Sequence, residues 1–110
     1  MVRITAYIKP HRLEQVKSAV AALGVTGLNV ADVRGTGNSP ERSGALGGAV
    51  TALPIRSRLS VVVADELCDE VVECIAENAR SGETGDGKIF VERVADAIRV
   101  RTGERGDAGL

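Results

Sequence analysis

Aromatic residues are nearly absent from this chain: among 110 residues there is no tryptophan, one tyrosine and one phenylalanine. Proteins that bind single-stranded nucleic acid or RNA commonly stack bases on aromatic rings, so this composition argues against both classes. Charge supplies no general attraction to nucleic acid or anionic membranes either, because 14 basic residues oppose 15 acidic ones. Any affinity for phosphate must therefore come from a local arrangement of residues.

Long hydrophobic runs are also absent, and cysteine is scarce. No apolar stretch approaches the roughly 20 residues that cross a bilayer, and residues 1–4 resemble a strand rather than a signal peptide. We therefore expect a cytoplasmic protein with no membrane insertion and no nucleic-acid partner.

Cys68 and Cys74 fall about 240° apart around one predicted helix, so they cannot pair within it and are expected to be idle thiols. His11 has no Cys or His at metal-ligand spacing, so no metal site is expected.

What the chain does contain is a hydrophobic pattern that occurs in two similar halves. In the first half, apolar residues alternate with polar ones over residues 2–9, which predicts a half-buried strand. Pro10 then favours the start of a helix, and Gly24 closes it. Residues 28–33 predict a second strand, with one change of phase that is consistent with a bulge.

The second half predicts the same order of elements. Residues 59–64 are rich in β-branched side chains and indicate a strand, and Asp65 is a plausible N-cap for the helix that follows. Residues 67–79 carry apolar side chains on one helical face. A loop at residues 81–87 and short strands at residues 89–91 and 97–101 complete the pattern.

Two strand–helix–strand units in series indicate an α+β fold of the ferredoxin-like, split βαβ kind (βαββαβ), with both helices on one face of an antiparallel sheet. A chain of 110 residues suffices for one such domain, residues 1–110, and is too short for two. The strand at residues 59–64 is apolar on both sides, because Val61 and Val63 point away from Val62. We therefore expect the face without helices to be buried in an oligomer.

Two segments predict loops rather than regular elements. Residues 38–55 contain Gly, Ser, Pro and Asn and keep no apolar period, which predicts a long flexible loop. Loops of this length in compact domains are usually functional or disordered. A shorter C-terminal loop is expected at residues 102–110.

Two motifs near the end of the chain indicate an anion site. The glycines of Gly85-Asp86-Gly87 permit a tight turn whose N–H groups can point at phosphate oxygens, and Lys88 adds a positive charge. On a strand, Arg99 and Arg101 would project from one face roughly 7 Å apart, with the valine between them facing the core. Each motif alone is weak, since the first is compatible with an ordinary turn and the second with a solvated strand face. Together they favour a site for phosphate.

These motifs resemble the B-loop and C-loop signatures of the PII signal-transduction family, small trimeric nucleotide sensors of nitrogen and carbon metabolism. The segments that carry the resemblance are Ala6-Tyr7-Ile8-Lys9-Pro10, Gly24-Val25-Thr26-Gly27-Leu28, Val33-Arg34-Gly35-Thr36-Gly37, Gly85-Asp86-Gly87-Lys88-Ile89-Phe90-Val91 and Arg99-Val100-Arg101-Thr102-Gly103-Glu104-Arg105-Gly106. The resemblance covers about residues 1–37 and 58–106. The long loop falls where the family has its T-loop, the segment that engages partner proteins.

The resemblance implies a homotrimer with an adenine nucleotide (ADP, AMP or ATP) in each cleft between subunits. Carried over residue by residue, the phosphates would be surrounded by Gly35, Gly37, Asn38, Gly85, Asp86, Gly87, Lys88, Arg99 and Arg101. Asn29 and Val62 would flank the ribose and adenine. Asn29 stands where the family commonly has Thr, and Ser60 stands where it usually has an acidic residue.

The long loop departs from the family pattern. Ser39 stands where members that sense 2-oxoglutarate have a glutamine that completes a Mg-ATP site, and a serine hydroxyl is too short to replace that amide. The loop is about two residues short and lacks the modifiable tyrosine, since the single tyrosine is Tyr7. Arg56 and Arg58 replace lysines, and a planar guanidinium suits a carboxylate or bicarbonate as second effector. These departures indicate a divergent branch and leave a role for Mg open.

The resulting expectation is a non-enzymatic signalling protein that binds an adenine nucleotide and regulates a partner, a transporter or a metabolic enzyme, through its T-loop. Two alternatives stay open. One is a weak ATPase, although no carboxylate–histidine pair is visible. The other is a nucleotide-independent structural trimer of the copper-tolerance type, in which Arg99 and Arg101 make salt bridges between subunits.

Overall fold

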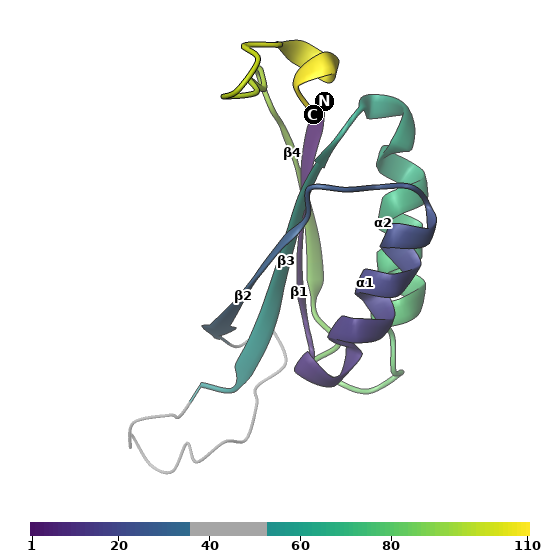
Figure 1. The fold of residues 1–110 in the computed structure, drawn as a ribbon. Coiled ribbons are helices and arrows are strands. Elements are labelled where there is room, and N and C mark those ends of the chain that lie inside the picture. Colours follow the sequence, from purple (N-terminus) through teal and green to yellow (C-terminus); the bar gives the residue numbers. More distant parts are fainter. Residues whose placement is uncertain (36–52) are drawn as a thin grey trace.

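The computed structural model describes residues 1–35 and 53–110 of the chain (Figure 1). Its helices and strands are, in order, β1 (Val2–Ile8), α1 (Leu13–Ala22), β2 (Asn29–Arg34), β3 (Ile55–Val63), α2 (Cys68–Ala79) and β4 (Lys88–Arg93). Single 3₁₀ turns precede both helices and lie near the C-terminus, at Pro10–Arg12, Asp65–Leu67 and Gly106–Gly109. Most of the predicted long loop, residues 38–52, lies outside the described residues.

The four strands form one sheet in the order β2-β3-β1-β4, and every neighbouring pair is antiparallel. β1 is central, so Val2 lies opposite Val63 of β3 on one side and opposite Arg93 of β4 on the other. Both helices lie side by side against one face of this sheet, as Figure 1 shows. This arrangement confirms the predicted ferredoxin-like βαββαβ fold.

The hydrophobic core lies between the sheet and the helices. It forms because alternate residues of each central strand point to the helical face. β1 contributes Ile4, Ala6 and Ile8, and β3 contributes Leu59 and Val61, all at most 1% exposed. The helices contribute Val16, Val20, Val71 and Ile75 at helical spacing, all 0% exposed. Burial of each large side chain contributes roughly 1.5–3 kcal/mol, and a one-residue slip of either strand would turn its row to solvent.

Helix α1 and its flanks form where the sequence predicts. Pro10 occupies the start of the preceding 3₁₀ turn, where its missing N–H costs no hydrogen bond. After the helix, Gly24 adopts φ +82°, a left-handed conformation that favours glycine and ends the helix. The predicted apolar face of α2 is also present, because Val71, Ile75 and Ala79 are buried.

The second and third strands differ from the prediction in two details. The expected bulge is absent from β2: its pairing with β3 runs without a gap from Asn29 opposite Ser60 to Arg34 opposite Ile55. β2 is an edge strand in which Val30 is 39% exposed, so burial does not impose strict alternation there. Because Ile55 belongs to β3, this strand begins four residues earlier than predicted, inside the expected loop.

Asp65 does not cap α2. The N-cap position belongs to Leu67, which makes no side-chain cap hydrogen bond. The carboxylate of Asp65 instead lies 2.9 Å from the amino group of Met1 and 2.8 Å from the guanidinium of Arg93, and these two contacts lower the pKa of Asp65. The N-cap prediction was wrong because contacts to the ends of β1 and β4, distant in sequence, outcompete the local cap.

The last predicted strand, which was expected to carry the two C-terminal arginines, does not form. Ile98 makes one isolated bridge with Arg105, and the N–H of Gly103 donates to the carbonyl of Arg99 at 2.7 Å. Gly103, at φ +75°, turns the chain back on itself, so this segment closes a local turn instead of extending the sheet. Val100 lies at the turn and is 99% exposed, so its predicted place in the core is wrong.

Candidate anion-binding site

A cavity of about 350 Å³ opens on the face of the sheet that the helices leave uncovered. Its floor follows from the strand register: Tyr7 of β1 lies between Arg58 of β3 and Lys88 of β4, so the three side chains project from the same face. Phe90 lies two residues further along β4, and its ring packs edge-on against Tyr7 with the centroids 6.1 Å apart. The cavity therefore combines an aromatic floor with flanking cations.

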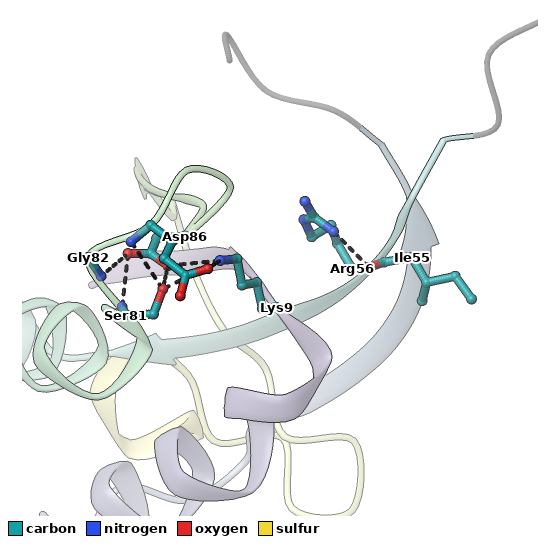
Figure 2. Close-up of polar contacts among 7 residues, drawn as sticks. Lys9, Ile55, Arg56, Ser81, Gly82 and Asp86 are labelled. Atoms are coloured by element: carbon teal, nitrogen blue, oxygen red, sulfur yellow. Dashed lines mark hydrogen bonds and ion pairs between the residues drawn. The ribbon is translucent and has the colours of Figure 1, made fainter. Parts of the chain in front are cut away.

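Positive charge surrounds this cavity. Its cationic lining residues are Arg34, Arg56, Arg58 and Lys88. No acidic side chain is among the described residues that line it. The guanidinium of Arg34 donates to the carbonyl of Leu53 at 3.2 Å. The guanidinium of Arg56 donates to the carbonyl of Ile55 at 3.1 Å (Figure 2). Guanidinium and ammonium groups grouped in this way attract phosphate, carboxylate or bicarbonate.

Lys88 and Arg58 are the two cations best placed to reach a ligand. Both residues are exposed and line the cavity. Within residues 1–35 and 53–110, neither side chain makes a hydrogen bond or an ion pair. An anion in the cavity would therefore displace no protein contact of either group.

The loop between α2 and β4, residues 81–87 and called the glycine loop below, is organised from within by Asp86. Its carboxylate accepts the N–H groups of Ser81 and Gly82, each at 2.9 Å, and the Ser81 hydroxyl at 2.5 Å (Figure 2). The ammonium of Lys9 lies 3.4 Å from the same carboxylate. These contacts, above all the Ser81 hydroxyl, hold the pKa of Asp86 well below its usual range. The side chain of Asp86 thus binds the loop itself. Asp86, which was predicted to lie beside the phosphates, is not among the residues that line the cationic cavity.

Gly85 and Gly87 form the wall of the cavity that the glycine loop contributes. Gly87 adopts φ +108°, and a Cβ added there would lie 1.7 Å from the carbonyl oxygen of Tyr7. Glycine is required at this position because the loop backbone is pressed against β1. Close approach to a ligand, the reason inferred from the sequence, is not needed to explain it. Lys88 follows as the first residue of β4.

A second group of predicted ligands lies further along the sheet. Asn29 and Val62 line a separate cavity of about 210 Å³ together with Leu110. Asn29 also lines a cavity of about 380 Å³ that reaches Arg58. Val62 is paired with Arg3 and stands four residues along β3 from Arg58, a distance of roughly 13 Å.

The C-terminal segment, which contains Arg99 and Arg101, lies at the end of the sheet opposite the loop between α2 and β4 (Figure 1). Arg99 donates to the carbonyl of Leu110 and lies 3.9 Å from Glu104, whereas Arg101 is exposed. Their predicted spacing on a strand face fails because this segment is a turn. The whole of β4, roughly 17 Å long, separates Lys88 from them. One chain therefore does not bring Lys88 and these arginines to the same phosphate.

Sequence reasoning placed six residues that do line the cationic cavity: Gly35, Arg56, Arg58, Gly85, Gly87 and Lys88. It missed Tyr7, Val33, Arg34 and Phe90. Alternation along the strands assigns Tyr7 to the open face, but only the long-range pairing of β1 with β4 brings it to Phe90. Gly37 and Asn38, also predicted, lie outside the described residues.

Three further features concern only residues 1–35 and 53–110. This part of the chain contains no group of three or more His, Cys, Asp or Glu side chains that could hold a metal ion. It has no helix that is both long and apolar enough to cross a membrane. Cys68 and Cys74 are free thiols.

A ferredoxin-like sheet with a cationic cavity beside a glycine loop defines a class of small α+β proteins suited to anion binding. The family model for nitrogen regulatory protein P-II matches residues 1–104, and the chain belongs to this family. The resemblance noted in the separate motifs is thereby confirmed across nearly the whole domain.

Individual relatives are similar over nearly the whole of this chain. The chain is 43% identical over 113 residues to nitrogen regulatory protein P-II of Haemophilus influenzae, with 100% of both chains covered. A P-II homologue of Arabidopsis thaliana is 43% identical over 108 residues, which span 96% of this chain and 55% of the homologue. The crystal structure of Arabidopsis thaliana PII bound to citrate superposes with a TM-score of 0.82 at 38% identity, covering 99% of this chain and 91% of that one.

Proposed function

We propose that this chain forms a homotrimer, binds an adenine nucleotide in each cleft between neighbouring copies, and regulates a partner protein through the loop at residues 38–55. The observation that carries the proposal is the separation of Lys88 from Arg99 and Arg101 at opposite ends of one sheet. In a closed ring, each contact joins one surface of a copy to a different surface of its neighbour. A phosphate held by both groups would therefore lie between two copies.

The two ends of the sheet would contribute different parts of this site. One copy would supply Lys88 and the N–H groups of the glycine loop, with Gly35, Gly37 and Asn38 at the base of the long loop. The neighbour would supply Arg99 and Arg101 for the phosphates, and Asn29 and Val62 for the ribose and adenine. Arg99 would then exchange its present contact with the carbonyl of Leu110 for a phosphate oxygen.

Calorimetric titration with ADP, AMP, ATP and adenosine tests nucleotide binding directly, with and without Mg²⁺. We expect the nucleotides to bind and adenosine to bind much more weakly, because Lys88 and the arginines act on phosphates. Light scattering on the same samples measures the assembly, for which we expect three copies. A stable monomer at micromolar concentration would contradict both the trimer and a cleft between copies.

A mixing experiment distinguishes a shared cleft from a site within one chain. Lys88→Ala and Arg101→Ala variants should each lose tight binding, because every cleft then lacks one phosphate contact. In trimers reassembled from equal amounts of the two variants, about a quarter of the clefts would combine an intact Lys88 with an intact Arg101. Recovery of that fraction of tight sites supports the shared cleft, whereas no recovery would show that one chain supplies both residues.

A second, smaller anion would bind beside the nucleotide, and bicarbonate is the candidate that we propose. Arg56 and Arg58 line the cationic cavity, and their planar guanidinium groups match planar oxyanions. Because the solved Arabidopsis relative holds citrate, a tricarboxylate is the natural competitor. Bicarbonate, citrate and 2-oxoglutarate should be titrated separately into nucleotide-saturated protein. Tight, Mg-dependent binding of 2-oxoglutarate would contradict the inference drawn from Ser39.

The same titrations separate the alternative functions. Slow release of phosphate from ATP would indicate a weak ATPase. Trimers that bind no nucleotide would favour a structural or metal-tolerance role, in which Arg99 and Arg101 serve only contacts between copies. The regulated partner, a transporter or a metabolic enzyme, and the cytoplasmic location stay predictions that these measurements do not address.

A further inference from the structure

We propose that Lys9 and Asp86 form a positioning pair that holds the glycine loop in its anion-binding conformation. This inference rests on the proposed function, because it concerns the loop that would bind the phosphates. Neither residue lines the cationic cavity, so neither is expected to touch the ligand. Their effect would pass through Gly85, Gly87 and Lys88, which do line it.

The carboxylate of Asp86 accepts two N–H groups that follow the end of α2. The helix ends at Ala79 and the backbone becomes extended at Arg80, so the N–H groups of Ser81 and Gly82 turn away from the last carbonyls of the helix. Asp86 accepts both, and it also accepts the Ser81 hydroxyl (Figure 2). An ionised carboxylate has about four acceptor positions, and these three donors with the ammonium of Lys9 occupy them. The loop therefore closes around one charge.

Lys9 connects this closed loop to the centre of the sheet. It follows β1 directly, and its side chain is only 15% exposed. Its ammonium lies 3.4 Å from the Asp86 carboxylate, 3.4 Å from the Ser81 hydroxyl and 4.0 Å from the Glu83 carboxylate. One ammonium thus contacts three residues of a seven-residue loop, and its residue directly follows a strand that is paired on both sides.

A second anchor lies two residues before Lys9, at Tyr7 within β1. The backbone of Gly87 is pressed against the carbonyl of Tyr7, so the loop is fixed to β1 through a side chain at Asp86 and through the main chain at Gly87. These two attachments immediately precede Lys88. They set where the Lys88 ammonium enters the cavity and which way the neighbouring N–H groups point.

If the Lys9–Asp86 pair orders the glycine loop before a ligand binds, it should raise the affinity for ADP. A loop that is already ordered loses less conformational entropy when a ligand binds. Removing the ammonium of Lys9 would leave Asp86 without its counter-charge and would loosen the loop. We expect ADP to bind about 10-fold more weakly as a result, comparable with one lost charge-assisted hydrogen bond.

The test compares Lys9→Met with Lys9→Arg and Glu83→Gln in the full-length trimer. Lys9→Met keeps most of the apolar stem and removes the charge, whereas Lys9→Arg keeps the charge and should restore most of the affinity. Glu83→Gln removes a charge that also faces Lys9. The Glu83 side chain is 81% exposed, and its carboxylate accepts no backbone N–H of residues 1–35 and 53–110. It serves as the matched control and should bind ADP as the wild type does.

Hydrogen exchange of the ligand-free proteins supplies the second measurement. In Lys9→Met, exchange should rise in the peptide that covers the glycine loop while the peptides of β1 and α2 keep their protection. If Lys9→Met does not assemble, Asp86→Asn, which keeps the shape of the side chain, decides the question by the same two measurements.

The outcomes separate this inference from the proposed function. Wild-type protein that binds no ADP would overturn both. Wild-type protein that binds ADP, with Lys9→Met binding it equally well, would overturn the positioning pair alone. Exchange that rises throughout the domain, or an arginine variant no better than the methionine variant, would show that Lys9 supports general stability and would also overturn the pair.

Discussion

At each end of the sheet, the carboxylate of one aspartate accepts backbone N–H groups of a loop or turn. The two carboxylates differ in how far these contacts lower their pKa. In the C-terminal turn, Asp96 accepts the N–H groups of Ala97 and Gly106, each at 2.9 Å, and pairs with Arg105 at 3.0 Å. In the glycine loop, Asp86 makes the same kind of contacts. Both carboxyl groups have a lowered pKa, and that of Asp86 is lowered much further.

The two aspartates differ in the cation with which each is paired. The cation beside Asp86 is Lys9, 15% exposed at the end of the central strand, whereas the cation beside Asp96 is Arg105, 70% exposed within the turn itself. Exposed pairs of the second kind contribute little, because water screens them. The glycine loop is therefore complete within one chain. The side-chain hydrogen bonds and ion pairs of the C-terminal turn all lie within residues 96–110, as expected of a surface that a neighbouring copy would finish.

Among the variants proposed here, Gly87→Ala should cause the largest losses of stability and of ADP binding. The new Cβ would overlap the carbonyl of Tyr7 at 1.7 Å, and φ +108° is strained for alanine, so the loop must move away from β1. We expect a loss of roughly 3 kcal/mol or more in the free energy of unfolding, measured with denaturant, together with loss of ADP binding. Gly82→Ala is the matched control: φ is +86°, but open space surrounds the new Cβ, so a cost of about 1 kcal/mol is expected. Equal costs would contradict the packing argument.

Lys88→Ala and Arg101→Ala test whether the two ends act on one ligand. Loss of a charge-assisted contact to phosphate costs about 1.5–3 kcal/mol, so each variant should bind ADP roughly 10- to 150-fold more weakly in calorimetry. Lys17→Ala removes an exposed lysine that pairs with Glu14 at 3.1 Å and should leave affinity unchanged. Full affinity in both test variants would place the nucleotide elsewhere.

Acid should weaken the glycine loop more than the C-terminal turn. In the folded chain Asp86 has a pKa below the ordinary value of about 3.9, so as pH falls the unfolded chain takes up the proton first. Its stabilising contribution is therefore full above about pH 5 and is lost progressively below about pH 4. Denaturant unfolding between about pH 7 and 3 should show a flatter profile for Asp86→Asn than for Asp96→Asn. The reverse order would mean that the exposed pair at the C-terminal end is the stronger one.

Val100→Ser is expected to have the smallest effect. The side chain is 99% exposed in one chain, so the free energy of unfolding should change by no more than about 0.5 kcal/mol. Unfolding followed at several protein concentrations makes this a sharper test. A larger loss that depends on concentration would place Val100 in a contact between copies.

Elements with a buried face were predictable from local patterns. β1 and both helices follow from alternation or helical spacing of residues such as Ile4, Val16 and Ile75, because burial enforces those periods. The last predicted strand failed for the opposite reason. Ile98 and Val100 alternate like strand residues, but both are exposed, and the turn at Gly103 outweighs their strand propensity.

The candidate site was predictable where its chemistry is local. Gly85, Gly87 and Lys88 are adjacent in sequence and line one cavity, so the motif located them. Tyr7 and Phe90 meet only through the pairing of β1 with β4, which the sequence pattern does not specify. Asp86 also contacts Lys9, which is distant in sequence. A motif of adjacent residues does not predict a contact between residues so far apart.

The central position of β1 has a consequence for the order in which the protein is made. Of the four strands, β1 leaves the ribosome before the others, yet its two neighbours are β3 and β4. Val2 cannot complete its pairing until Arg93 has been made. Pairings between such distant segments form late, since the intervening chain must close a large loop. The floor and the glycine-loop wall of the cavity thus cannot exist on a nascent chain that ends before β4. A chain interrupted during translation would expose its apolar strand to aggregation without ever forming the cavity.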